Sequence, residues 1–362
     1  MQNTIVAIDL AKNSFSVHVA DRQGRMLQQK KKLSRSGVRK FVANLKPSII
    51  AIEACGGSNH WARHFLALGH NVKMIAPQFV KPYVKADKTD AKDAAAIAEA
   101  ASRHHMNCVP VKNLQQQNIK ALHAIRNRLV VNKVQLTNET RGILNEYGII
   151  VTKGDSALRK KLVAMIDDSY EAFEGEEFSS FLRCKMADLY EELCELEQRI
   201  AKQDKEIAAY CKIDEAVVRL MKVPGIGPIT ASSLVAHVGN AAEFKSGRQF
   251  AAYFGLVPRE HSTGGKTKLL GISKRGDKNI RTLLIHGARA VLNSGKYVKK
   301  KNQESWSHGR SRQLCWAQML VDKKGSNKAA VALANKHARI AWVILAKGVN
   351  YDPQHKSMHI TH

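Results

Sequence analysis

Four carboxylates in the first part of the chain have the types and spacing of a metal-binding set. Asp9 ends the run VAID, Glu53 ends the run IIAIE, and Asp90 and Asp93 lie in KTDAKDAAAIAEA. Residues three apart share one face of a helix, and side chains at the ends of neighbouring parallel strands open onto one crevice. The sequence therefore predicts that these acids converge.

Such a cluster needs cations, because carboxylates held a few ångströms apart repel one another. Ligation by oxygen alone favours Mg²⁺ or Mn²⁺ over zinc. Two such ions about 4 Å apart are a recurring arrangement in enzymes that act on phosphodiesters. We predict a divalent-metal site of this kind at Asp9, Glu53, Asp90 and Asp93.

Each acid also has a simpler explanation when it is taken alone. Asp90 is a reasonable helix N-cap, a role that Asp87 would fill equally well, and Asp93 suits the first helical turn. Asp9 would fit the start of a turn, and Glu53 a surface ion pair with a lysine. The order Asp, Glu, Asp-x-x-Asp along alternating strands and helices favours the joint metal site.

A second candidate centre is the hydroxyl pair in PREHSTGGKTK, where Ser262 and Thr263 lie in a glycine-flanked loop. A serine needs a base, a metal or a stabilising field to attack phosphorus, and His261 is the one local base that we identify. The alternative is a loop serine that only binds a phosphate. The basic residues expected to hold the nucleic acid are Arg259, Lys266, Lys268, Lys274, Arg275, Lys278 and Arg281.

The segment VPGIGPITASSLVAHVG has the form of the second half of a helix-hairpin-helix. Gly225 and Gly227 would allow close approach and expose backbone N–H groups that bind phosphate without reading base sequence. A purely structural glycine turn between two helices is the alternative.

The composition points to a nucleic-acid partner. Lys and Arg total 58 against 31 acidic residues, a formal net charge of +27 that suits phosphate neutralisation. No apolar run approaches 18 residues and the start lacks a signal-peptide pattern, so we expect a cytoplasmic protein without membrane binding. The six scattered cysteines show no zinc spacing and are expected to be reduced.

The elements that must position these residues fall into an α/β part followed by helical parts. Residues 1–110 read as β-β-β-α-β-α-β-α, with a meander first and buried parallel strands after it. Residues 111–212 read as two long helices with coiled-coil spacing, separated by the acidic link DDSYEAFEGEEFSS; they would pair within the chain, pair between protomers, or form a solvated spacer. Residues 213–350 form a basic domain ending in a helix closed by Gly348, and residues 351–362 a loose tail.

Six motifs together resemble one known family over almost the whole length of the chain. They are AIDLAK, IEACGG, KTDAKDA, VPGIGPITA, QFAAYFGLVPREHSTGGK and GISKRGDKNIRTLLIHGARA. The chain resembles the insertion-sequence one-ten (IS110) transposases, bridge-RNA-guided recombinases related to the Piv and MooV invertases, in the branch with STGGK loops.

This resemblance implies an N-terminal RNase-H-like (RuvC-like) domain whose DEDD metal site matches Asp9, Glu53, Asp90 and Asp93. It also implies a coiled coil and a mainly helical transposase domain with a helix-hairpin-helix element. In the family a serine forms a covalent phosphoserine with DNA, the serine and the metal site come from different protomers of a tetramer, and an element-encoded RNA guides recognition of both DNA partners.

The family's serine can be aligned with either of two residues. Counting forward from GLVP gives Thr263, and counting back from SKRG gives Ser262. We choose Ser262, whose primary hydroxyl is less hindered, and keep Thr263 as the alternative. The predicted function is a DNA transposase that acts with Mg²⁺ or Mn²⁺, a guide RNA and further copies of the chain, as a dimer to a tetramer. The competing functions are a metal-dependent junction nuclease that uses water and a non-enzymatic RNA-binding scaffold.

Overall fold

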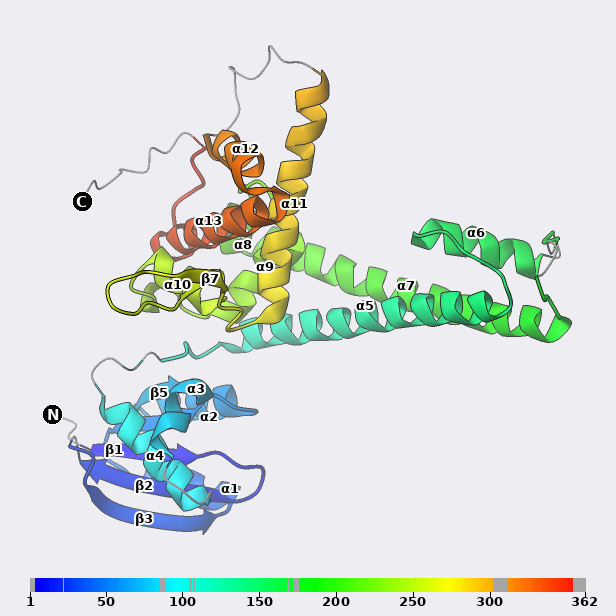
Figure 1. Cartoon of the computed structure of the whole chain (residues 1–362). Coiled ribbons are helices and arrows are strands. Elements are labelled where there is room, and N and C mark those ends of the chain that lie inside the picture. The colour runs from blue at the N-terminus through cyan, green and yellow to red at the C-terminus, as the bar shows by residue number, and fades with distance from the viewer. Residues whose placement is uncertain are drawn as a thin grey trace. The chain divides into compact units, whose positions relative to one another are not determined.

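The structure of this chain, a computed structural model, contains two compact units (Figure 1). It describes residues 4–21, 23–84, 89–103, 106, 108–167, 169–171, 176–301 and 312–353. Residues 1–116 with 238–243 form unit 1, and residues 117–237 with 244–362 form unit 2. The tail predicted to be loose lies largely outside the described residues.

Unit 1 is built on a five-stranded mixed sheet with the strand order β3-β2-β1-β4-β5. The first three strands pair antiparallel, and β4 and β5 continue the sheet parallel to β1. The strands are β1 (Thr4–Asp9), β2 (Phe15–Asp21), β3 (Met26–Leu33), β4 (Ile49–Glu53) and β5 (Asn71–Ile75). The predicted meander followed by buried parallel strands is confirmed.

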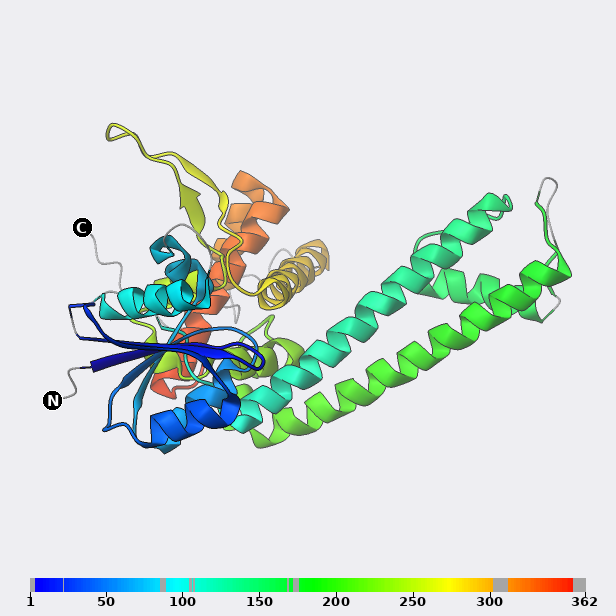
Figure 2. The same cartoon turned by 90° about the horizontal axis from the view of Figure 1, so that it is seen from below.

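Helices cover both faces of this sheet, with α4 and α1 on opposite sides (Figure 2). One apolar cluster joins the sheet to α1 and α2 around Trp61 and Phe65, and the other joins it to α4. The helices of unit 1 are α1 (Arg35–Ala43), α2 (Ser58–Ala67), α3 (Pro77–Val80), the 3-10 helix η1 (Lys81–Tyr83) and α4 (Asp90–Ser102). The short α3 and η1 were not predicted.

The two long helices α5 (Leu114–Glu146) and α7 (Ser180–Ile213) pack antiparallel within one chain. They belong to unit 2, except for the first residues of α5, which belong to unit 1. Leucines of the two helices meet, including Leu129 of α5 and Leu196 of α7, in keeping with the coiled-coil spacing of the sequence. Arg126 also pairs with Asp204, with Nε and Oδ1 2.5 Å apart. Along this stretch the apolar side chains of each helix are therefore buried against the other helix.

An additional helix, α6 (Asp155–Ile166), lies between α5 and α7 in the chain and packs on both of them through Leu158, Leu162 and Met165. Gly148 and Gly154, with φ of 77° and 114°, mark the turn that separates α6 from α5. The described part of the acidic link after α6 holds neither helix nor strand until α7 begins, as predicted. The helix α6 itself was missed.

The rest of unit 2 is mainly helical with one small hairpin. Its elements are α8 (Glu215–Met221), α9 (Pro228–Val238), α10 (Gly247–Tyr253), β6 (Pro258–Glu260), β7 (Leu269–Ile272), α11 (Lys278–Lys301), α12 (Arg312–Lys324) and α13 (Ser326–Lys347); the 3-10 helix η2 (Ala241–Glu243) belongs to unit 1. Gly348, with φ of 66°, ends α13 as predicted.

The helix α13 corrects one expectation about apolar runs. Among the described residues it alone is long and apolar enough to cross a membrane by length and composition, because alanines dilute its isolated basic residues. It packs against α8, α10, α11 and α12, and its buried residues include Leu333, Ala338 and Ile344. These contacts are those of a core helix.

Candidate functional site

The alternation of side chains along β1 and β4 directs Asp9 and Glu53 toward α4. In β1, Val6 and Ile8 belong to the cluster under α1 and α2, whereas Ile5 and Ala7 belong to the cluster under α4. Asp9 follows Ala7 on the same face, because successive side chains of a strand point to opposite faces. Glu53 follows Ala51 in the same way, and the register pairs Ile8 with Ile52. Both acids therefore end neighbouring parallel strands on the α4 side.

Small residues on both sides of the interface let α4 lie close to the sheet. The helix buries alanines, among them Ala94 and Ala98, and the facing strands contribute Ala7, Ala20 and Ala51. Alanine side chains leave a short separation between backbones, so that residues in the first turn of α4 can reach the end of β1. The alanine-rich run after Asp90 and Asp93 thus has a positional role.

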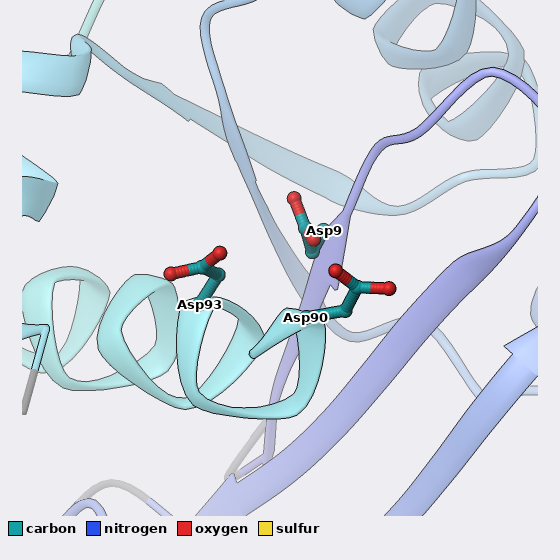
Figure 3. Close-up of side chains that lie close together, drawn as sticks. All are labelled: Asp9, Asp90 and Asp93. Carbon is teal, nitrogen blue, oxygen red and sulfur yellow. The ribbon is translucent and has the colours of Figure 1, made fainter. Parts of the chain in front are cut away.

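Three of the four predicted ligands meet at this point (Figure 3). One carboxylate oxygen from each of Asp9, Asp90 and Asp93 lies within 4.8 Å of the others. Asp90 is exposed, whereas Asp9 and Asp93 are half-buried. Glu53 is half-buried at the end of β4, beside Asp9 in the sheet, but is not part of the group of three.

The start of α4 also bears on the simpler explanation of these acids. The N-cap is Thr89, which makes no side-chain capping bond, and Asp90 is the first residue of the helix. The structure therefore does not use Asp90 as the N-cap, and Asp87 lies outside the described residues. Both acids still occupy the first turn, where the helix dipole favours negative charge.

The chemistry of the three carboxylates fits a hard divalent cation. Two oxygens on one Mg²⁺ lie at most about 4.2 Å apart, twice a bond of about 2.1 Å. The observed limit of 4.8 Å exceeds this by about half an ångström, which small side-chain rotations would close. The pKa of the neighbouring Cys55 thiol is raised mainly by desolvation, and the negative charges of Glu53 and Asp9 raise it further.

Ser262 and Thr263 lie near the tip of an exposed β-hairpin rather than in an irregular loop. The β6–β7 ladder continues through His261 and Lys268, with the His261 N–H donating to the Lys268 carbonyl at 2.9 Å. It ends where Thr263 and Lys266 exchange backbone bonds of 3.3 and 3.1 Å. The two turn residues between them, Gly264 and Gly265, have φ of 56° and 75°. Two consecutive positive φ values are the requirement of a type I′ hairpin turn, which explains the glycine pair.

The hairpin separates its hydroxyls onto two faces. Glu260 pairs with Leu269 and Thr263 with Lys266, so the register between them is continuous. Alternation then puts Ser262 on the same face as Glu260. Thr263 shares the opposite face with His261, Lys266 and Lys268.

A carboxylate that sequence reasoning missed contacts the predicted nucleophile. The Ser262 hydroxyl donates to Glu260 Oε1 at 2.5 Å. The adjacent His261, the base identified from the sequence, lies on the other face of the ribbon. The signal was present as an acid two residues before the serine in a strand-forming segment.

The base of the hairpin is held by the loop Ser273–Asp277, and Arg281 is part of that support. Its side chain is 9% exposed and donates to the carbonyls of Phe254 and Arg275 at 3.1 and 2.9 Å. The structure thus gives Arg281 an internal role instead of the predicted contact with nucleic acid. The other predicted contacts remain exposed: Arg259, Lys266, Lys268, Lys274, Arg275 and Lys278.

Close backbone packing reinforces this support. A Cβ on Gly276 would lie 1.9 Å from the Tyr253 carbonyl oxygen, so only glycine fits there. Asp277 accepts the Ile280 N–H at 2.9 Å at the start of α11, and its other oxygen lies 3.7 Å from His237 Nδ1. Burial and the charge of Asp277 raise the pKa of Tyr253 to about 12, so its phenol stays neutral.

The glycine turn between α8 and α9 has two different glycines. A Cβ on Gly225 would lie 2.7 Å from the Gly287 carbonyl oxygen, and a Cβ on Gly287 would lie 1.9 Å from the Gly225 carbonyl oxygen. Gly225 is therefore needed for packing against α11. Gly227, just before α9, has open space around it. An open groove beside this turn is also lined by Lys222, Thr230 and His286.

Unit 1 carries a basic surface that was not predicted. Arg35 and Arg39 lie over the ring of Trp61, at 5.1 and 5.7 Å, and Lys30 lies over Phe41. Arg35 and Arg39 are exposed. The sequence signal was the segment from Lys30 to Lys40, which holds six basic residues and no acid.

Comparison with known proteins identifies the family. A family model described as "Transposase IS116/IS110/IS902 family" matches residues 217–303, and a second, for DEDD transposases of IS110, matches residues 6–149. A probable family 20 transposase of Pseudomonas aeruginosa is 46% identical over 96% of this chain and 98% of its own length. The transposases for IS1111A of Coxiella burnetii and for IS1328 of Yersinia enterocolitica are each 40% identical, over 96% and 95% of this chain and 91% and 97% of their own lengths. The resemblance read from the motifs is thus confirmed, and the chain belongs to the IS110 family of insertion-sequence transposases.

Proposed function

We propose that this transposase cuts and rejoins the DNA of an insertion element through a covalent phosphoserine at Ser262. The observation that carries the proposal is the convergence of Asp9, Asp90 and Asp93 on one point in a chain of this family. Ser262 supports it as an exposed hydroxyl on a β-hairpin whose other face carries lysines that attract DNA. Thr263, on the lysine face of the hairpin, is the alternative nucleophile.

Asp9, Asp90 and Asp93, with Glu53 beside them, would hold Mg²⁺ or Mn²⁺. A bound divalent ion supplies charge stabilisation to the phosphate and lowers the proton affinity of a coordinated oxygen. The acids belong to unit 1 and Ser262 to unit 2. In this proposal the metal-binding acids and Ser262 act on the same phosphodiester, and they come either from one chain or from different copies in a dimer or tetramer.

The finer architecture is part of the same proposal. Residues 1–110 would be an RNase-H-like (RuvC-like) domain, to which the strand order around β1 and the acids at its end are suited. Residues 111–212 would be the coiled-coil part, and residues 213–350 the transposase domain. Within the latter, α8, the glycine turn and α9 would act as a helix-hairpin-helix, with the N–H groups near Gly227 free to approach a phosphate.

The partners follow from charge and family. DNA would contact the exposed lysine and arginine side chains of the hairpin and of the loop formed by residues 273–277. A guide RNA encoded by the element would have a further surface at Lys30, Arg35 and Arg39 of unit 1. The protein would work in the cytoplasm, at the nucleoid.

Trapping the protein on DNA tests the mechanism. Sequencing the RNA that copurifies with the protein would supply the guide and, from it, matching end-labelled DNA. The wild type should then give a labelled protein band on a denaturing gel, Ser262→Ala should give none, and Thr263→Ala should retain it. Asp93→Asn should lose cleavage while nucleic-acid binding persists, since binding rests on the basic surfaces.

Other outcomes would identify a different function. Loss of the adduct in Thr263→Ala alone would move the nucleophile to Thr263. Metal-dependent cleavage without any adduct would indicate a nuclease that uses water. Binding that survives chelation, with no cleavage by any metal, would indicate an RNA-binding scaffold.

A further inference from the structure

The hairpin that carries Ser262 offers its hydroxyl one carboxylate and no competing base on the same face. The Ser262 hydroxyl donates to Glu260 Oε1 at 2.5 Å. The two residues are two positions apart in one strand, so their side chains project from the same face. We propose that Glu260 is the proton acceptor that activates Ser262, an inference that rests on the proposed phosphoserine mechanism.

The backbone pairing of the hairpin supports this role, because a base must stay within hydrogen-bonding distance of the proton that it removes. The ladder is closed on one side of Ser262 by the Thr263–Lys266 bridge and the two-glycine turn. On the other side His261 pairs with Lys268, and Glu260 with Leu269. The backbone on both sides of the serine–glutamate pair is therefore paired, which fixes the direction of both side chains.

The competing base is excluded by the same geometry. His261 is next to Ser262 in sequence but projects from the opposite face, with Thr263, Lys266 and Lys268. The two faces would thus divide the work. The lysine face would attract the DNA backbone to the hairpin, and the glutamate face would hold the nucleophile, deprotonate it and meet the phosphate that it attacks.

The step balances as follows. The Ser262 Oγ–H proton passes to a Glu260 carboxylate oxygen while an Oγ lone pair forms the bond to phosphorus. The bond from phosphorus to the leaving sugar oxygen breaks, and that oxygen takes a proton from water. In the reverse step, which rejoins DNA, the sugar hydroxyl gives its proton to hydroxide, its oxygen forms the bond to phosphorus, the bond from phosphorus to Ser262 Oγ breaks, and protonated Glu260 returns its proton to Oγ.

The test compares two nearly isosteric variants, Glu260→Gln and His261→Gln, in the full-length protein with its copurified RNA. Adduct formation is measured on denaturing gels at saturating DNA, and DNA affinity separately. Loss of a general base slows such a step by about 100-fold or more. Glu260→Gln should therefore form the adduct at least about 100-fold more slowly with undiminished affinity. His261→Gln removes the competing base, and at saturating DNA it should slow adduct formation far less than Glu260→Gln does.

Glu260→Gln also separates a proton acceptor from a residue that only orients the hydroxyl, because the glutamine amide oxygen still accepts a hydrogen bond from Ser262 but is a far weaker base. A wild-type rate in Glu260→Gln overturns the inference while leaving the phosphoserine intact. Absence of any adduct from the wild type overturns the proposed function and this inference with it.

Discussion

Neutralising one acid of the cluster should make the variant more stable than the wild type when no metal is bound. In Mg²⁺ the wild type should be the more stable of the two. Because the three carboxylate oxygens lie within 4.8 Å of one another, each pair of charges repels by at least about 0.9 kcal/mol at a dielectric constant of 80 and about 3.5 kcal/mol at 20. Because Asp90 is exposed and Asp93 only half-buried, the lower figure applies. Asp93→Asn removes two such pairs and should relieve about 2 kcal/mol of repulsion.

The helix dipole acts in the opposite direction but is weaker. Loss of a first-turn acid costs about 0.3–1 kcal/mol. The net prediction is that, without metal, the free energy of unfolding of Asp93→Asn is about 1 kcal/mol larger than that of the wild type. A cation bound only by the folded wild type adds about 2.7 kcal/mol at a hundred times its dissociation constant, so the order reverses in Mg²⁺.

Scanning calorimetry in chelator, in MgCl₂ and in KCl of matched ionic strength measures this reversal. The KCl arm is needed because salt alone screens repulsion between exposed charges. Glu139→Gln, which neutralises an exposed acid on α5, is the matched control and should respond to Mg²⁺ as the wild type does. If Asp93→Asn is the less stable protein without metal, and Mg²⁺ raises both midpoints equally, the acids are first-turn residues without a shared cation.

Two further predictions concern unit 2. Gly287→Ala would place a Cβ 1.9 Å from the Gly225 carbonyl oxygen and should lower the free energy of unfolding by about 3 kcal/mol or more. Gly142→Ala, in open space on α5, is the control and should be neutral or stabilising. Equal unfolding midpoints for the two variants would contradict the close packing. Burial lowers the pKa of His337 to about 4, below its unfolded value of about 6.5, so the unfolded chain takes up a proton that the folded chain refuses. Stability should therefore fall by about 1.4 kcal/mol per unit as pH drops from 6.5 toward 4, and His337→Leu should flatten that slope in urea titrations.

Local patterns were sufficient for much of unit 1. Three successive short strand-like runs with tight turns predicted β1 to β3 as a meander, and the continuous run IIAIE predicted a buried parallel strand. The position of Asp9 and Glu53 at neighbouring strand ends follows from the same pairing, because parallel strands end at one edge of a sheet. These features depend on residues close in sequence or on simple pairing rules.

Glycines and basic residues were harder to interpret, since each serves either packing or binding. Gly225 approaches Gly287 and Arg281 binds two internal carbonyls, and both partners lie far away in the sequence. We predicted contact with nucleic acid for Gly225 from the helix-hairpin-helix motif, with a structural glycine turn as the alternative, and for Arg281 from its basic segment. Only the packed structure distinguishes a buried guanidinium from an exposed one such as that of Arg275.

For the two centres, the sequence alone determined which residue types were available: four acids in one order, and a serine–threonine pair before two glycines. The tertiary structure decided which of them meet. Alanines on α4 and on the facing strands set the short separation that joins Asp9 to Asp90 and Asp93. The extended backbone of the hairpin put Ser262 on the face of Glu260 and not on that of His261, because successive side chains of a strand point to opposite faces. That alternation is local, whereas the short separation at α4 arises from packing between distant segments, which no single segment of the chain encodes.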